Sequence, residues 1–171
     1  ACMAHLAHGT TSICPTTLTC TDEELLTFFG CYREAGKQME NGPELLGIHL
    51  EGPYFSLEQR GAQDPQYIKV PAKDDYKKLL DASDDIIRMS AAPELEGAME
   101  LADELKARGI LASIGHSDAT YAHVIEAWER GYTHVTHLYS GMSTIRRINA
   151  YRHLGVIESA YLIDGMTVEI I

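Results

Sequence analysis

The sequence predicts an α/β fold in which a parallel sheet is built from repeated strand–helix units. Short apolar runs with the length of buried strands lie at 45–50, 85–92, 110–114 and 133–138. Helical segments separate them. In 95–108, for example, apolar residues recur every three or four positions, and Gly109 follows. Strands that alternate with helices in this way favour βαβ units and a parallel sheet.

The first part of the chain is expected to hold a strand, a long helix and a second strand. Residues 10–15 form a short β-branched run, which favours a strand. Thr21 and Glu24 have the spacing of a capping box, so a helix is expected to run from there to about residue 41, where Asn-Gly-Pro ends it. The run at 45–50 is then expected to be one continuous strand.

The remaining elements follow from the same signals. Residues 53–71 form a long polar segment, and such a loop is uncommon unless it is functional. Helices are expected at 73–81 and 117–130, and a final pair of strands at 161–163 and 167–171.

Three residues with metal-binding chemistry stand at the ends of predicted strands. Glu51 follows one apolar run, His116 follows the next but one, and His137 lies at the end of another. Side chains at the carboxyl ends of parallel strands gather at one edge of the sheet. One carboxylate and two imidazoles form a plausible metal site with room for water.

Composition excludes several other classes of function. Fourteen Lys and Arg against 25 Asp and Glu give a formal charge of −11, which argues against nucleic acid or an anionic membrane as a partner. An anionic small substrate stays possible, because one arginine can hold a phosphate. No apolar run approaches the roughly 18 residues of a membrane span, and no secretory signal is visible. The four irregularly spaced cysteines favour reduced thiols, so a cytoplasmic protein is expected.

The pattern of units predicts part of a (β/α)8 barrel. Five or six strand–helix units are counted in 171 residues, whereas a complete eight-stranded barrel has about 250 residues. Residues 1–171 are therefore expected to be the central portion of one barrel domain, without its first and last strands. Such a piece exposes two sheet edges, so we expect a homo-oligomer.

Four segments, in order, carry a resemblance to a known family: His-Leu-Glu-Gly-Pro at 49–53, Gly-Ala-Gln-Asp-Pro at 61–65, Gly-His-Ser-Asp-Ala-Thr at 115–120 and Thr-His-Leu-Tyr at 136–139. In their order and spacing they resemble the N-acetylglucosamine-6-phosphate deacetylase family, which belongs to the amidohydrolase superfamily of metal-dependent barrels. The resemblance implies that Glu51, His116 and His137 bind a divalent metal ion, zinc in the first instance.

The resemblance also implies a set of substrate-binding positions. Ala62 and Gln63 match the loop that approaches the sugar, and Ser140 and Gly141 match a pair that contacts the substrate. Arg152 best matches the phosphate-binding arginine, with Arg146 and Arg147 as alternatives in the same stretch.

The implied reaction is metal-assisted hydrolysis of the N-acetyl group of N-acetylglucosamine 6-phosphate, giving glucosamine 6-phosphate and acetate. An aspartate is expected to move the proton. It would lie beyond Ile171, so no catalytic acid or base is assigned in this chain. Two alternatives stay open: an amidohydrolase acting on a cyclic amide or an amine, and a catalytically incomplete fragment that binds a sugar phosphate.

Overall fold

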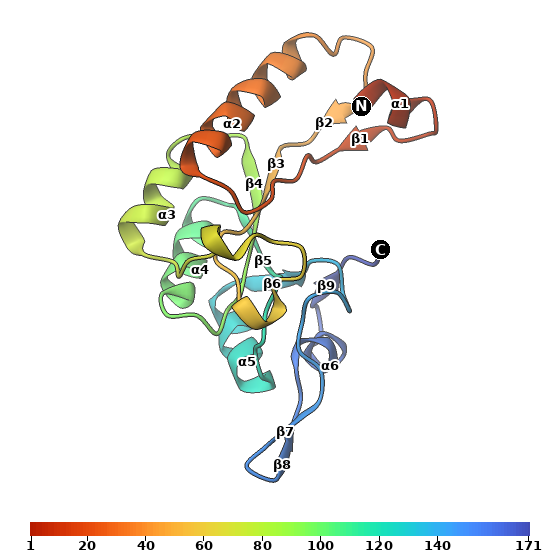
Figure 1. Ribbon diagram of the computed structural model, residues 1–171. Coiled ribbons are helices and arrows are strands. Elements are labelled where there is room, and N and C mark those ends of the chain that lie inside the picture. Colours follow the sequence, from red (N-terminus) through yellow and green to blue (C-terminus); the bar gives the residue numbers. More distant parts are fainter.

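The computed structural model describes all residues from 1 to 171 and shows a curved parallel sheet with helices packed on its outer side (Figure 1). Its five strands lie in the order β3-β4-β5-β6-β9, and every neighbouring pair is parallel. Their bounds are β3 Ile48–Glu51, β4 Ile86–Ala91, β5 Leu111–Ile114, β6 Tyr132–Val135 and β9 Thr167–Val168. Sequential order with parallel pairing is the arrangement of a (β/α) barrel wall, as the sequence predicts.

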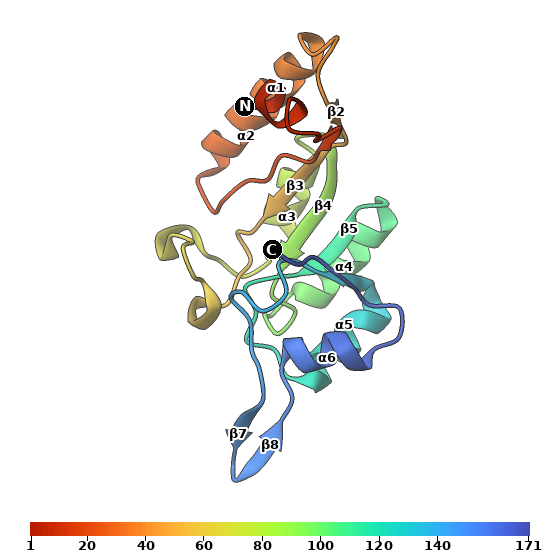
Figure 2. The same ribbon diagram turned by 90° about the vertical axis from the view of Figure 1, so that its right-hand side faces the viewer.

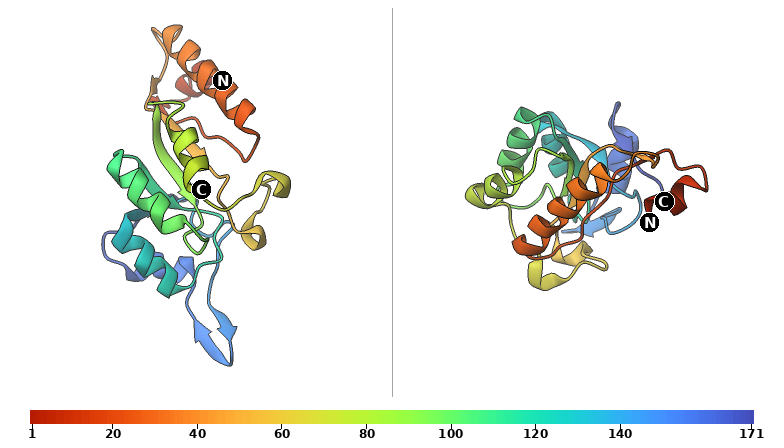
Figure 3. Two further views of the ribbon diagram at one scale, coloured as in Figure 1. Left: turned by 90° about the vertical axis from the view of Figure 1, so that its left-hand side faces the viewer. Right: turned by 90° about the horizontal axis from the view of Figure 1, so that it is seen from above.

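One helix follows each of the first four strands and leads to the next. These helices are α3 Lys73–Leu80, α4 Ala98–Ala107, α5 Tyr121–Arg130 and α6 Val156–Leu162. Each contacts the following one, so together they form the outer layer of the wall (Figures 2 and 3). The crossovers between parallel strands all run in the same direction, which places the helices on one face of the sheet.

The N-terminal part packs against one end of the wall. It contains α1 Cys2–Leu6, β1 Ser12–Ile13, α2 Asp22–Lys37 and β2 Glu44–Leu45. Strands β1 and β2 are parallel, and Thr16 forms a parallel bridge with His49, which continues the line of the sheet past β3. The capping box expected at the start of α2 is present, since Glu24 N–H donates to Thr21 Oγ1 at 3.2 Å and Thr21 N–H donates to Glu24 Oε2 at 2.9 Å.

The strands present two different faces. Their outer side chains join the hydrophobic core with the helices, for example Leu50 and Ile114 against Leu101 and Leu105, all fully buried. Residues that alternate with these, such as Arg88 and Ser90, stay outside that core and face the concave side. The core lies between sheet and helices, and the concave side is polar.

Two of the expected strands are corrected by the structure. The predicted strand at 45–50 is divided into β2 and β3 by Gly47, whose φ of 143° is one that L side chains rarely adopt. A Cβ atom there would lie 2.4 Å from the side chain of Ile87. The predicted strand at 161–163 is wrong, because it lies in the last turn of α6 and its C-cap. The Glu158 carboxylate accepts from Gly155 N–H at 2.8 Å and caps this helix at its start.

A hairpin that was not predicted projects from the wall (Figures 1 and 2). Strands β7 Arg146–Ile148 and β8 Tyr151–His153 pair in antiparallel fashion. Asn149 and Ala150 between them both have positive φ, at 48° and 68°, as a two-residue turn of this hairpin type requires.

The rest of the expected elements are found, but several are shorter than predicted. The strand expected at 10–15 is β1 Ser12–Ile13, the strand expected at 167–171 is β9 Thr167–Val168, and the helix expected at 117–130 begins at Tyr121. The polar segment 53–71 holds two short 3-10 helices, Leu57–Gln59 and Pro65–Tyr67. The four cysteines form no disulfide within the chain. None of the helices is both long and apolar enough to cross a membrane.

Replacing Thr21 with Ala should lower the free energy of unfolding by about 1 kcal/mol, because the N-cap hydroxyl is lost at the start of α2. Urea denaturation measures the change. Thr27→Ala is the matched control: Thr27 is exposed on the same helix and bonds only to the Glu23 carbonyl, at 2.9 Å, so its loss should leave stability almost unchanged. Equal losses in both variants would contradict the capping role.

Candidate metal centre

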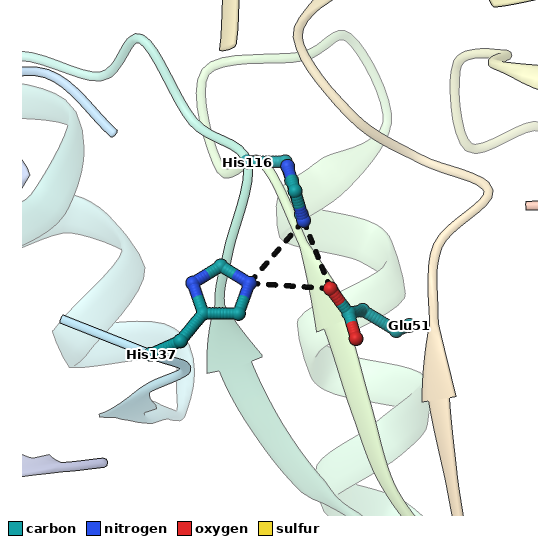
Figure 4. Close-up of side chains that lie close together, drawn as sticks. All are labelled: Glu51, His116 and His137. Atoms are coloured by element: carbon teal, nitrogen blue, oxygen red, sulfur yellow. Dashed lines mark hydrogen bonds and ion pairs between the residues drawn. The ribbon is translucent and has the colours of Figure 1, made fainter. Parts of the chain in front are cut away.

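Glu51, His116 and His137 lie together at the carboxyl edge of the sheet, as the strand-end pattern predicts (Figure 4). Glu51 Oε1 is 2.8 Å from His116 Nε2 and 3.2 Å from His137 Nε2. The two Nε2 atoms are 3.2 Å apart. Glu51 ends β3, His116 lies two residues after β5 and His137 two residues after β6, so three separate strands bring them to one point.

The backbone turns sharply at both histidines. His116 has a φ of 46° and His137 a φ of 34°, in a region that residues other than glycine seldom occupy. Strand β6 accordingly ends at Val135, earlier than the sequence predicts. Backbone strain of this kind gathers at functional sites, where surrounding packing holds it. Here the sharp turn lies at each histidine of the cluster.

Neighbouring groups orient two of the three side chains. His116 Nδ1 donates to the Gln59 carbonyl at 2.9 Å, which leaves Nε2 as the free nitrogen facing the cluster. The Gln63 amide donates to Glu51 Oε1 at 3.4 Å. His137 Nδ1 is buried and has no hydrogen-bond partner.

The electrostatics of the cluster favour an ionised carboxylate. Burial raises the pKa of Glu51, but the side-chain contacts with His116 and His137 outweigh it and hold the pKa at about 2. The same contact with Glu51 raises the pKa of His137 above its ordinary value. The three side chains thus form a compact set of one anionic oxygen and two imidazole nitrogens.

This set fits a divalent transition metal. Bonds of about 2.0–2.1 Å from a tetrahedral zinc ion place neighbouring ligand atoms about 3.3 Å apart. The three observed separations, 2.8, 3.2 and 3.2 Å, lie at or somewhat below that spacing. Three protein ligands would leave a fourth position for water or substrate, which is the composition of catalytic zinc sites.

The structure places four of the expected substrate residues near this cluster. Gln63 is 4% exposed, and its Oε1 accepts from Thr19 N–H at 2.8 Å and from Thr19 Oγ1 at 3.0 Å. Its amide group is therefore turned toward Glu51, and the adjacent Ala62 is exposed.

Ser140 and Gly141 lie beside the two histidines. Ser140 N–H donates to the His137 carbonyl at 3.0 Å. A Cβ atom on Gly141 would lie 2.9 Å from His116 Nδ1, so this position leaves room only for glycine. Gly141 also has a φ of 58°.

Arg152 is not brought to the cluster. It is exposed on β8, in the hairpin that projects from the wall. Of the two alternatives, Arg146 is engaged with Asp118, donating to its side chain and, at 2.7 Å, to its carbonyl. Arg147 pairs with Arg152 across the hairpin and is also exposed.

Several polar residues around the centre were missed by the sequence reasoning. They lie on the concave face of the sheet: Arg88, Ser90, Ser113, Thr136 and Glu169. The available signal was a set of polar residues at alternate positions within otherwise apolar strands. His49 and His134 join them, and burial followed by the charge of Arg88 lowers the pKa of His49 to about 4.

Glu94 is a second half-buried carboxylate at this edge. It accepts from Ser117 Oγ at 2.7 Å and from Asp118 N–H at 2.5 Å. Burial raises its pKa in spite of both hydrogen bonds. Glu94 thereby ties the turn after β4 to the turn that carries His116.

Comparison with known proteins agrees with this geometry. A model of the amidohydrolase family matches residues 1–170, and the chain belongs to that family. N-acetylglucosamine-6-phosphate deacetylase of Bacillus subtilis is 37% identical over 167 residues, which are 95% of this chain and 41% of the relative. The enzyme of that name from Haemophilus influenzae is 37% identical over 155 residues, 90% of this chain and 39% of the relative.

Solved structures confirm the fold. The crystal structure of N-acetyl-D-glucosamine-6-phosphate deacetylase from Mycobacterium smegmatis matches with a TM-score of 0.87 and 31% identity. The match covers 99% of this chain and 43% of that one. The deacetylase from Thermotoga maritima matches with a TM-score of 0.86 and 28% identity, over 99% of this chain and 44% of that one. The chain thus spans about two fifths of the length of its relatives, and the resemblance seen in the sequence is confirmed.

The half-buried Glu94 should make stability depend on pH. Because its pKa in the folded state is raised, ionisation costs stability as the pH rises from the ordinary value of 4.5 through the raised value. The free energy of unfolding, measured in urea at a series of pH values, should fall over this window relative to Glu94→Gln. Glu126→Gln, which changes an exposed residue of α5, is the control. Its free energy of unfolding should depend on pH in the same way as that of the parent protein. A Glu94→Gln curve parallel to the parent would contradict the role of burial.

Proposed function

We propose that this chain is the central part of an N-acetylglucosamine-6-phosphate deacetylase. It would hydrolyse the N-acetyl group of the sugar phosphate to give glucosamine 6-phosphate and acetate. The main support for the proposal is that Glu51, His116 and His137 meet in a metal-binding arrangement. The chain that contains them is similar to enzymes of that name. No membrane or nucleic-acid partner is part of the proposal.

Glu51, His116 and His137 are proposed as ligands of a zinc ion. When bound, the ion would lower the pKa of water and polarise the amide carbonyl. The protein's part is to hold the ligands in place. Gln59 orients the ring of His116, and Gln63 holds the carboxylate of Glu51. An aspartate is proposed to move the proton, and no residue of this chain is assigned that role.

The sugar would lie against the loops next to the cluster. We assign Ala62 and Gln63 to one wall and Ser140 and Gly141 to the other. The close approach of Gly141 to His116 supports a backbone contact with the substrate, since a side chain at that position has no space. The exposure of Ala62 and Ser140 leaves both free to meet a ligand.

Arg152 is proposed to bind the phosphate, because a planar guanidinium can hold two phosphate oxygens at once. The engagement of Arg146 with Asp118 supports this choice over Arg146. The position of Arg152 on a projecting hairpin means that it meets the sugar only if the hairpin folds over the site or enters the site of a second copy.

We further propose a cytoplasmic homo-oligomer. The unpaired cysteines are compatible with a reducing compartment. Large apolar side chains are exposed on and near the hairpin, including Ile145, Tyr151, Tyr161 and Leu162. Multi-angle light scattering on the full-length protein should give at least twice the monomer mass; a clean monomer would contradict the proposal.

Replacement of any of the three proposed metal ligands should greatly reduce both metal binding and deacetylase activity. In the full-length protein, Glu51→Gln, His116→Asn and His137→Asn should each lower the zinc content and reduce deacetylation by about 100-fold or more. Elemental analysis and an acetate-release assay measure the two effects. His123→Asn, an exposed change on α5, is the control and should keep both.

The same assay with a panel of cyclic amides and amino-substituted rings tests the alternative amidohydrolase activities. Turnover of one of these compounds in place of the sugar phosphate would assign the protein to that amidohydrolase activity instead of deacetylation. Zinc binding without any turnover would indicate a binding protein.

Arg152→Ala should raise KM for N-acetylglucosamine 6-phosphate by about 10- to 100-fold, the range expected for lost charge-assisted hydrogen bonds. Weak activity on unphosphorylated N-acetylglucosamine should not change. Arg147→Ala is the matched control, since Arg147 faces Arg152 across the hairpin. If Arg147→Ala or Arg146→Ala shows the KM effect instead, the phosphate contact belongs to that residue.

A further inference from the structure

The concave face of the sheet is polar where an apolar filling is usual. His49 is 1% exposed, Ser90 and Ser113 are fully buried and Thr136 is 3% exposed. Barrel interiors of this kind are mostly filled by branched apolar side chains. Burying a polar group is costly unless it is hydrogen-bonded, so a whole polar layer calls for a physical reason.

These four side chains form one continuous chain of short hydrogen bonds. His49 Nε2 is 2.6 Å from Ser90 Oγ, which is 2.6 Å from Thr136 Oγ1. Thr136 Oγ1 is 2.7 Å from Ser113 Oγ. The chain therefore joins β3, β4 and β5 to the residue that follows β6.

The direction of the hydrogen bonds is set by Arg88. Its Nη2 donates to His49 Nδ1 at 2.8 Å, and a guanidinium can only donate. His49 Nδ1 is thus the acceptor, and Nε2 carries the proton that is donated to Ser90. Arg88 is held in turn by an ion pair with Glu169, which lies one residue after β9 and three strands away along the wall. The curvature of the sheet lets these two side chains meet.

The chain lies directly beneath the candidate metal centre. His49 precedes Glu51 by two residues on the same face of β3, Ser113 precedes His116 by three, and Thr136 is adjacent to His137. The backbone ladder is irregular at two of these places. Its register shifts between Ile48 and His49, and again between Ala112 and Ser113. Bulges of this kind redirect side chains and weaken the hold of the ladder on the register.

We propose that the hydrogen-bonded chain from His49 through Ser90 and Thr136 to Ser113, held at one end by Arg88 and Glu169, positions the three metal ligands. It joins the strands by side-chain hydrogen bonds next to the places where the register of the backbone ladder shifts, and so fixes the relative positions of the strand ends that carry Glu51, His116 and His137. The inference rests on the proposed metal-dependent function. His49, Ser90, Thr136, Ser113 and Arg88 are positioning residues, because none of them is a ligand.

The test compares two buried serines in the full-length protein. Ser90→Ala breaks the chain at its middle. Ser159→Ala is the matched control: Ser159 is also fully buried, it loses a 2.6 Å hydrogen bond to the Gly155 carbonyl, and it lies in α6 outside the concave face. Zinc affinity is measured by competition with a chelator, together with Tm, kcat and KM.

Ser90→Ala should weaken zinc binding by about 10-fold, the low end of the loss expected when groups that orient metal ligands are removed. It should also lower kcat and leave KM unchanged. Ser159→Ala should lower Tm to a similar degree and leave zinc affinity unchanged. Equal zinc affinity in the two variants would overturn the positioning role and leave the layer with a purely structural one.

A second pair of variants, both at Thr136, tests the proposal if Ser90→Ala does not fold. Thr136→Val keeps the shape of the side chain and removes its hydroxyl, whereas Thr136→Ser keeps the hydroxyl. Zinc affinity should fall in the valine variant and recover in the serine variant; the reverse order would overturn the proposal.

The outcome that contradicts the proposed deacetylase function differs from the outcome that contradicts the positioning role. If the parent protein binds zinc without deacetylating the sugar phosphate, the proposed function fails while the variants still report on positioning. If the parent protein does not bind zinc, the proposed function and the positioning role are both contradicted.

Discussion

The parallel direction of five neighbouring strands is the constraint on which the rest of this structure depends. Because every strand ends at the same edge, a carboxylate at the end of β3 and histidines after β5 and β6 meet, although 86 positions separate the first from the last. The helices that return the chain must then lie on the outer side. The hydrophobic core forms between strands and helices, and the carboxyl edge stays open to a ligand.

The two faces of the sheet contribute to the structure through different interactions. On the outer face, Leu50, Met89 and Ile114 pack against helices and contribute the burial that stabilises the fold. On the inner face, the chain of hydroxyl groups is buried and the Arg88–Glu169 ion pair is half-buried. Nearly all hydrogen bonds are made there, since Arg88 Nε is the one buried group of this set without a partner. Satisfied polar layers hold a geometry more tightly than apolar packing does, because each hydrogen bond has a required distance and direction.

The candidate centre also shows how local strain and long-range support combine. His116 and His137 each adopt a positive φ immediately beyond a strand, which turns the imidazole into the cluster. Glu94, Gln59 and Gln63 then hold the turns and ligands from neighbouring loops. The strained backbone is thus fixed by contacts that come from elsewhere in the chain.

The sequence by itself determined the strand–helix order, the capping box at Thr21 and the three residues of the centre, because periodicity, capping and strand-end chemistry are local patterns. Only the tertiary structure decided the rest. Gly47 divides a predicted strand because Ile87 packs against it, and Tyr161 and Leu162 form the last turn of α6, the helix that Glu158 caps at its start. The contact of Arg88 with Glu169 depends on sheet curvature, and the place of Arg152 depends on a hairpin turn. The contacts of Gly47 with Ile87 and of Arg88 with Glu169 join residues distant in the chain, which no local pattern encodes. The α6 cap and the hairpin turn are local, but they lie in apolar or polar runs too short for periodicity to separate helix from strand.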